Sequence, residues 1–300
     1  MSLSWRDNFK LAGSDFHYGV KLMLWDSQSW ITKYNNATGK LSDYYEGYRI
    51  GDIWGYNIEG LFTSYDEIAN HADQDYIKIS DSKIWQPGDL KFADLNGDGK
   101  IDKGAQTLSD HGDLVIVGNE EERYHYGFNL NVGWKGIGIS AFFQGVGKRD
   151  WYPGQETGFF WGKYNRPYGY SLKMHENRWT EENPNPNAYW PRLVGYSSEN
   201  GGRPMGTPNN RYMQDASYLR LKALTVDYSL PQAWVSKLGL TGLKIYFTGE
   251  NLFTFSNVCE NFDPEVIKGG DVDLKDRKGE EQGYSYPLLK TYTVGLNVSF

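Results

Sequence analysis

A strict alternation of apolar and polar side chains at the end of the chain constrains the fold most. The residues between the apolar positions are small or polar, and the apolar positions are Tyr292, Val294, Leu296, Val298 and Phe300. The same alternation fills residues 124–146, where the two-residue turn Lys135-Gly136 interrupts it. A period of two marks a β-strand with one apolar face, and a two-residue turn joins two antiparallel strands. The sequence therefore predicts an all-β, antiparallel protein.

The alternation predicts eight strands joined by connections of very unequal length. The predicted strands cover 3–11, 16–24, 28–35, two in 124–146, 217–229, 242–253 and 291–300. The connections 25–27, 135–136 and 231–241 are short, whereas 36–123, 148–216 and 254–287 are long; only the short link 12–15 breaks this order. Up-and-down membrane barrels have short periplasmic turns and long extracellular loops. We expect an up-and-down portion of a transmembrane β-barrel, with long extracellular loops that carry short helices at 64–72 and 172–179, and another short helix at 231–237.

Composition excludes several classes of protein. The net charge of −7, without a cluster of Lys and Arg, argues against a nucleic-acid partner. Cys259 is the only cysteine, so the chain has neither an internal disulfide nor a Cys-based zinc site. No run of about 18 apolar residues is present to form a transmembrane helix. The first residues, Met1–Trp5, show no export signal, and we expect the chain to be a fragment of an exported protein.

One acidic loop has the spacing of a calcium site. Side-chain oxygens stand at alternate positions, on Asp94, Asn96, Asp98 and Asp102. A glycine occupies the sixth place, and Lys100 at the seventh place offers its backbone carbonyl. Ala105 stands where an EF-hand has its bidentate Glu, so Asp110 or Asp113 would have to replace that ligand. Two interpretations stay open: a Ca²⁺ site, or a loop held by its own Asx turns without a metal. No other cofactor is expected.

The connection 148–216 is rich in aromatic residues. Rings with polar handles suit sugar rings or peptides, and the candidates for a substrate or partner surface are Trp151, Tyr152, Trp161, Tyr164, Tyr168, Tyr170 and Trp190. The alternative is that these rings pack a core of the loop itself or form the aromatic girdle of a barrel. For any single ring this alternative is favoured.

No motif for catalysis was found. The five histidines have no metal-ligand spacing, there is no Gly-x-Ser-x-Gly turn, and Cys259 has no base partner in sequence. We expect that the protein is not an enzyme.

Several blocks resemble one family in the family's own order. Residues 48–62 (YRIGDIWGYNIEGLF) and 87–102 (PGDLKFADLNGDGKID) are similar to the central signature of SusC/RagA TonB-linked outer-membrane proteins. Residues 217–231, 248–253, 263–265 and 286–300 are similar to the C-terminal blocks of that family, and the blocks together span nearly the whole chain. The chain is thus identified as a member of this family on its sequence motifs.

The resemblance implies a location and partners. Residues 1–300 would be the C-terminal part of a plugged barrel of about 22 strands in the outer membrane, without the plug domain, TonB box and signal peptide. The whole protein would contact membrane lipid and TonB, and would import oligosaccharides or oligopeptides with a SusD-like surface lipoprotein.

Two rival functions remain at this stage. A soluble, calcium-dependent carbohydrate-binding β-sandwich would bury the apolar faces of 124–146 and 291–300 against a second sheet. A secreted glycoside hydrolase would bring two carboxylates together in a cleft.

Overall fold

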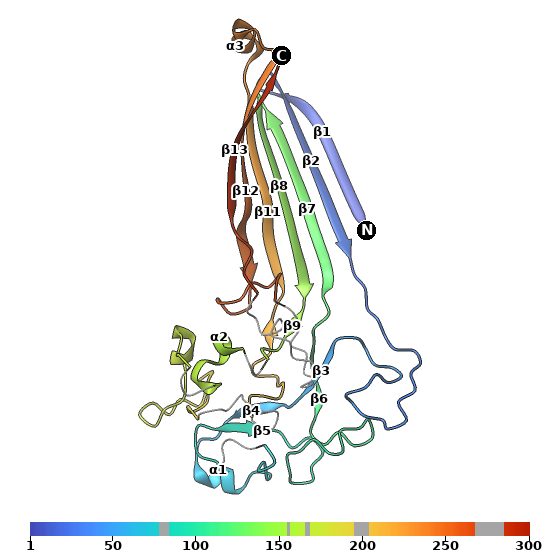
Figure 1. Cartoon of the computed structure of the whole chain (residues 1–300), viewed down its shortest axis with the longest axis vertical. Helices are drawn as coiled ribbons and strands as arrows, with labels where there is room; N and C mark the ends of the chain where they lie inside the picture. The colour runs from blue at the N-terminus through green and yellow to red at the C-terminus, as the bar shows by residue number, and fades with distance from the viewer. Residues whose placement is uncertain (78–83, 155–156, 166–168, 195–203, 268–284) are drawn as a thin grey trace.

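The computed structural model describes residues 1–77, 84–154, 157–165, 169–194, 204–267 and 285–300. The molecule has two parts, a long, twisted sheet and a body of loops at one end of it (Figure 1). We call the described residues of the connections 26–122, 149–217 and 257–290 the loop domain.

The sheet is antiparallel throughout, and each strand pairs with its neighbours in chain order. Its strands are β1 (Ser2–Leu11), β2 (Ser14–Trp25), β7 (Arg123–Trp134), β8 (Ile137–Lys148), β11 (Tyr218–Ser229), β12 (Gly242–Ser256) and β13 (Thr291–Ser299). β1 and β13 form its two edges, and the sheet does not close on itself within the described residues. The all-β, up-and-down arrangement of the prediction is present as an open sheet.

The predicted strand at 28–35 is wrong, so this sheet has seven strands instead of eight. Trp30 makes only an isolated bridge to Arg49, and Ile31 exchanges backbone hydrogen bonds with residues 47 and 48. These local partners hold the segment in the loop domain. β2 instead pairs directly with β7, from Phe16 opposite Trp134 to Trp25 opposite His125.

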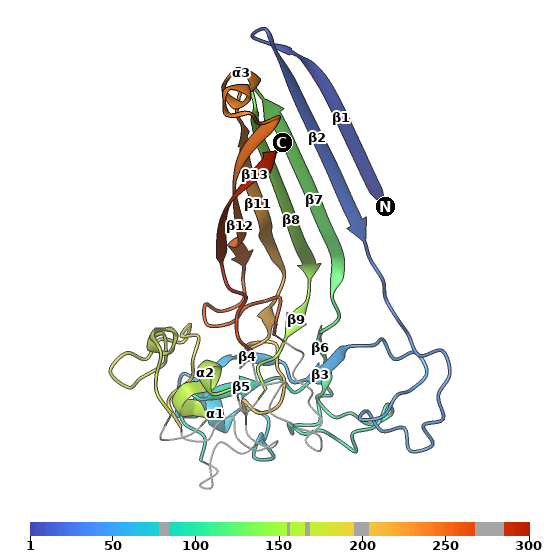
Figure 2. The same cartoon turned by 45° about the horizontal axis from the view of Figure 1, so that its top comes forward.

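This correction makes the order of connections regular. The short connections 12–13, 135–136 and 230–241 all lie at one end of the sheet, and the three long ones at the other (Figures 1 and 2). Without a strand at 28–35, the connection at 12–15 is no longer an exception, because the turn 12–13 lies at the same end of the sheet as the other short connections. Ala12-Gly13 and Lys135-Gly136 have positive φ at both central residues, as expected for hairpin turns that match the twist of the strands.

The loop domain contains three small two-stranded sheets and several short helices. The strand pairs are β3 (Asp52–Gly55) with β6 (Val115–Asn119), β4 (Ile58–Leu61) with β5 (Leu90–Phe92), and β9 (Asp150–Trp151) with β10 (Gln214–Asp215). Its helices are α1 (Tyr65–Ala69), α2 (Gly158–Trp161), η1 (Gly162–Tyr164) and η2 (Lys173–Glu176); the turn between β11 and β12 holds α3 (Gln232–Val235) and η3 (Ser236–Leu238). The three predicted short helices are confirmed, whereas α2 and η1 were not predicted. No described helix has the length and apolar character needed to cross a membrane.

The main hydrophobic core lies in the loop domain. Its fully buried rings include Tyr56, Phe62, Phe92, Trp151, Phe160, Trp161, Trp190 and Tyr212. The cluster on the sheet is much smaller and consists of Ala141, Leu221 and Leu252 with partly buried neighbours. The sheet therefore lacks the covered apolar face that stabilises an ordinary water-soluble sheet.

Candidate functional site

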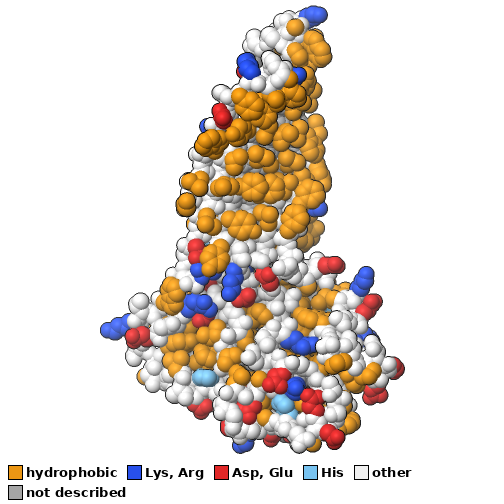
Figure 3. Space-filling view, turned by 180° about the vertical axis from the view of Figure 1, so that it is seen from behind, with side chains coloured by type: hydrophobic (Ala, Val, Ile, Leu, Met, Phe, Trp, Pro, Cys, Tyr) orange, Lys and Arg blue, Asp and Glu red, His pale blue; other side chains and the backbone are white. Residues whose placement is uncertain are grey.

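One face of the sheet is apolar and exposed. Residues paired across neighbouring strands point to the same side, and one such row crosses all seven strands: Phe9, Phe16, Trp134, Ile137, Tyr228, Ile245 and Leu296. Figure 3 shows the apolar side chains as a continuous band over the sheet. Val294, in the middle of β13, is 75% exposed. We call this surface the apolar face.

The opposite face is polar. The next cross-strand row is Asn8, His17, Gly133, Gly138, Asp227, Tyr246 and Gly295. The His17 ring, the Asp227 carboxylate and the Tyr246 ring lie over the glycine opposite each of them, where an added Cβ would overlap. A hollow on this face is bordered by residues that include Arg6, Asn8, His17 and Asn131. The polar face therefore offers hydrogen-bonding groups to water or a solute.

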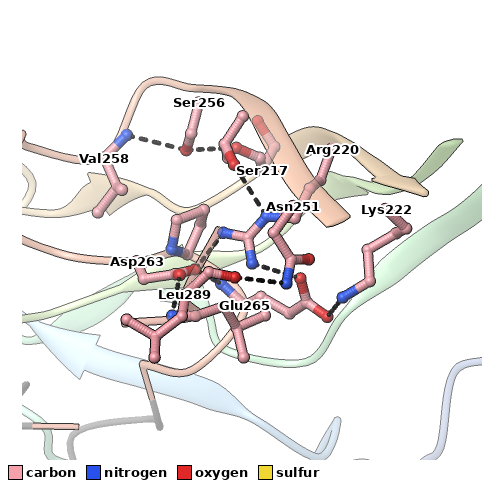
Figure 4. Close-up of polar contacts among 12 residues, drawn as sticks. Ser217, Arg220, Lys222, Asn251, Ser256, Val258, Asp263, Glu265 and Leu289 are labelled. Carbon is pink, nitrogen blue, oxygen red and sulfur yellow. Dashed lines mark hydrogen bonds and ion pairs between the residues drawn. The ribbon is translucent and has the colours of Figure 1, made fainter. Parts of the chain in front are cut away.

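An ion-pair cluster joins the polar face to the loop domain (Figure 4). We give this name to Arg220 and Lys222 of β11 with Asp263 and Glu265 of the connection after β12. Arg220 is only 3% exposed and donates from Nη2 to Asp263 Oδ1 at 2.5 Å and from Nη1 to Glu265 Oε2 at 2.8 Å. Lys222 Nζ donates to Glu265 Oε1 at 2.7 Å. Every charge in the cluster is thus paired.

Asp263 also holds the base of its loop together. Its carboxylate accepts the backbone N–H of Glu265. It also accepts that of Leu288, which lies just before β13 and 25 positions after Asp263. Burial raises the pKa of Asp263, but the hydrogen bonds from Arg220 and these amides outweigh it, so the pKa is below its usual value. The ionised carboxylate is therefore the form that stabilises the loop.

A second buried arginine holds the same loop. Arg149 follows β8 and donates from Nη2 to the carbonyl of Ile267 at 2.7 Å and from Nη1 to that of Pro264 at 3.2 Å. Nη1 also lies 3.2 Å from Glu122 Oε1, before β7. Arg149 and Arg220 thus fix residues 263–267 against the ends of three strands. These charges could not be paired from the sequence, because the partners lie far apart in the chain.

The long connections also bind one another. Arg192 forms two hydrogen bonds with the buried Asp89 carboxylate, at 2.6 and 3.0 Å, and the Ile58 N–H donates to Asn210 Oδ1 at 2.8 Å. Burial raises the pKa of Asp89 despite the opposing effect of Arg192. These contacts make the connections 26–122 and 149–217 one folded body.

Most of the predicted aromatic surface is buried. Trp151, Tyr152, Trp161, Tyr164 and Trp190 are at most 4% exposed and pack in the core of the loop domain. Because a buried ring cannot contact a ligand at the surface, these five residues are core residues here, and the alternative considered from sequence describes them. Tyr170 is 52% exposed and stays a candidate. Tyr168 lies outside the described residues.

The acidic loop is held by hydrogen bonds to its own backbone. Asp94 accepts the N–H of Gly97 and Gly99, Asn96 accepts that of Asp98, and Asp98 accepts that of Lys100. Asp102 accepts the N–H of Gly104, and the Asp110 carboxylate accepts that of Ala105.

The residues considered as a replacement ligand are engaged as well. The buried Asp113 carboxylate accepts the N–H of Leu95 and Asp102. Among the described residues, no group of three or more His, Cys, Asp or Glu side chains is placed to hold a metal. This arrangement is that of Asx turns, and the calcium site stays a prediction.

Known proteins similar to this chain are receptors and transporters. The chain is 28% identical over 257 residues to TonB-dependent receptor P3 and 32% identical over 247 residues to TonB-dependent receptor P26, both from Formosa agariphila. The alignments cover 85% and 80% of this chain, which spans only 22% of the length of each relative. No family model matches the chain.

Two solved structures have a similar fold. The RagAB peptide transporter aligns with the whole chain at a TM-score of 0.60 and 20% identity, and this covers 29% of the transporter chain. The RagAB peptide importer in its open-open state gives a TM-score of 0.61 at 19% identity, with 28% of that chain covered. At this identity the similarity concerns the fold alone.

Proposed function

We propose that this chain, which is similar to TonB-dependent receptors, forms part of the wall of an outer-membrane barrel that imports nutrients and is not an enzyme. The observation that supports this proposal is the row of exposed or half-exposed apolar side chains across seven strands, with a polar row on the opposite face. Apolar side chains facing lipid and polar ones facing the lumen are what a membrane barrel requires.

The loop domain would then lie outside the cell, opposite the short turns. A folded body of three long connections at one end of the sheet fits a surface that meets solutes before they enter. We propose that the imported solutes are oligosaccharides or oligopeptides. A SusD-like surface lipoprotein captures them together with the receptor, and TonB supplies the energy for their transport. Among the described members of the aromatic set, the exposed Tyr170 is the candidate contact that remains. Tyr168 stays a candidate from the sequence alone.

The soluble alternatives have less support. A carbohydrate-binding β-sandwich needs a second sheet over the apolar face, and no sheet among the described residues covers it. A glycoside hydrolase does not fit the similarity to receptors.

A pair of neighbouring substitutions tests the proposed wall. Val294→Arg places a charge on the apolar face, and Thr293→Arg places the same charge on the polar face. In the full-length receptor, Val294→Arg should destabilise the folded barrel by about 2–4 kcal/mol if the site lies near the bilayer midplane. Thr293→Arg should change this value little. Heat-modified migration on gels and urea unfolding in lipid vesicles measure the stability of both variants. Equal destabilisation by the two substitutions would contradict the proposal that the apolar face contacts lipid.

The partner is tested separately. The full-length receptor should retain a SusD-like surface lipoprotein of the same organism during purification, and deletion of that lipoprotein should abolish uptake of the oligosaccharide or oligopeptide. Wild-type uptake without it would refute this part of the proposal alone.

Calcium binding is tested by titration. If the loop holds Ca²⁺ through Asp94, Asn96, Asp98 and Asp102, calorimetry should detect one site in wild type and none in Asp98→Ala. Identical traces for the two proteins would leave the hydrogen-bonded loop as the only role of these residues.

A further inference from the structure

The turn end of the apolar face contains a groove. It is lined almost entirely by apolar atoms and crosses four strands, with walls formed by Ile137, Val226, Tyr228, Ile245, Phe247 and Val294. Asp227 also borders the groove, but its carboxylate lies on the polar face, where it pairs with Lys244 at 3.0 Å. The groove is therefore an apolar channel without a free charge of its own among the described residues.

A cation stands two residues before Ile137, which lines the groove, and has an unfavourable backbone conformation. Lys135 directly precedes Gly136 and Ile137 in the β7–β8 turn and has a φ of 50°. Turns of this type favour Asn or Gly there, because a longer L-residue is strained in the left-handed region. The Lys135 ammonium lies 4.5 Å from the centre of the Trp134 ring and has no carboxylate partner among the described residues. A lysine kept at a conformational cost suggests a use for its charge.

The next turn carries the same pair of residue types. α3 contacts β12, whose residues line the groove. Trp234 and Leu238 of α3 and η3 are 60% and 67% exposed, and Lys237 is exposed beside them. Trp gathers at the boundary between lipid and water, and Lys favours the anionic headgroups found there.

We propose that this end of the apolar face binds one anionic phospholipid. An acyl chain lies in the groove, and Lys135, assisted by Lys237, contacts the phosphate. The occupant is a lipid because the groove continues the apolar face. It is anionic because neither Lys135 nor Lys237 has a carboxylate partner in the part of the chain that the structure describes. The inference rests on the proposed function, since it requires that the apolar face lies in a membrane.

The test uses the full-length receptor in nanodiscs of mixed phosphatidylglycerol and phosphatidylethanolamine, with native mass spectrometry of the released protein. Lys135→Asn removes the cation and suits the turn better, so loss of folding does not confuse the result. Val226→Phe fills the groove from an exposed position. The matched controls are Leu22→Phe, on the apolar face away from the groove, and Lys33→Asn, in the loop domain.

Wild type and both controls should retain one phosphatidylglycerol. Its apparent affinity should fall about tenfold in Lys135→Asn, as for loss of a charged hydrogen bond, and should also fall in Val226→Phe, because the larger ring occupies the groove. Equal retention in all variants, or equal retention of phosphatidylethanolamine, would overturn the inference while the receptor remains in the disc. Failure of the receptor to enter discs would instead refute the proposed function, and the inference with it.

Discussion

Two buried arginines join the sheet to the loop domain through hydrogen bonds. Arg220 and Arg149 reach the same five-residue stretch from two strands, one through carboxylates and the other mainly through backbone carbonyls. A buried charge is tolerated only when it is paired, so removal of one partner leaves the others uncompensated.

Arg220→Met should therefore lower the free energy of unfolding of the loop domain by about 3–5 kcal/mol. The matched control is Lys244→Met, because Lys244 is exposed in its pair with Asp227 and pairs open to water contribute at most about 1 kcal/mol. Hydrogen exchange of residues 257–267 measures the difference. Similar protection in both variants would mean that the ion-pair cluster does not hold this loop.

His175 gives the loop domain a predicted pH dependence. Its Nδ1 accepts the N–H of Leu172 at 2.9 Å, and its Nε2 lies 2.7 Å from the Phe160 carbonyl, so the buried ring is neutral with its proton on Nε2. Burial lowers the pKa of His175 from its ordinary value of 6.5. Below pH 6.5 the unfolded chain therefore takes up a proton that the folded ring resists.

The stabilisation is complete above pH 6.5 and decreases as the pH falls below that value, until the folded-state pKa is reached. Tryptophan fluorescence during denaturation at pH 7.5 and 5.5 should show this loss. His175→Gln should reduce the difference in stability between the two pH values. An unchanged difference in His175→Gln would assign the effect to other groups.

Within the sheet, glycines provide room for large side chains on the facing strand. An added Cβ on Gly133 would overlap the His17 ring, whereas one on Gly242 would meet only Ser299 at ordinary contact distance. Gly133→Ala should therefore weaken the β2–β7 pairing by about 1–3 kcal/mol, and Gly242→Ala should change the stability little. Amide exchange in the β2–β7 and β12–β13 strand pairs compares the two variants. Equal protection in both would show that the His17 ring moves aside freely.

The strands were predictable where the alternation was long. The hairpin 124–146, the short turns and the strand at 291–300 follow from the period of two, and so does the grouping of long connections. The segment 28–35 was misassigned because its alternation is short and its partners, residues 47–50, are local.

The site was less predictable. Sequence cannot distinguish a ring that packs in a core, such as Trp190, from one that faces solvent, such as Tyr170. The pairing of Arg220 with Asp263 across 43 positions depends on the sheet bringing β11 beside β12. The acidic pair Asp263-Pro-Glu265 was visible as a motif, but its partner was not.

At the scale of the whole molecule, the hydrophobic residues are divided between two environments. The loop domain buries its rings in a core of its own, as a water-exposed body must. The sheet instead exposes its apolar residues over seven strands (Figure 3). This contrast is expected of a protein with one end in water and one wall in lipid.

The most direct test of this account measures which side chains of β13 meet lipid. Single nitroxide labels at positions 292 to 298 of the full-length receptor, with Cys259 replaced by Ser, would be compared in nanodiscs by their accessibility to oxygen. The account predicts a period of two, with high values at Tyr292, Val294, Leu296 and Val298 and low values at Thr293, Gly295 and Asn297. Uniformly low accessibility at all seven positions would show that the apolar face is covered by protein and would contradict the account.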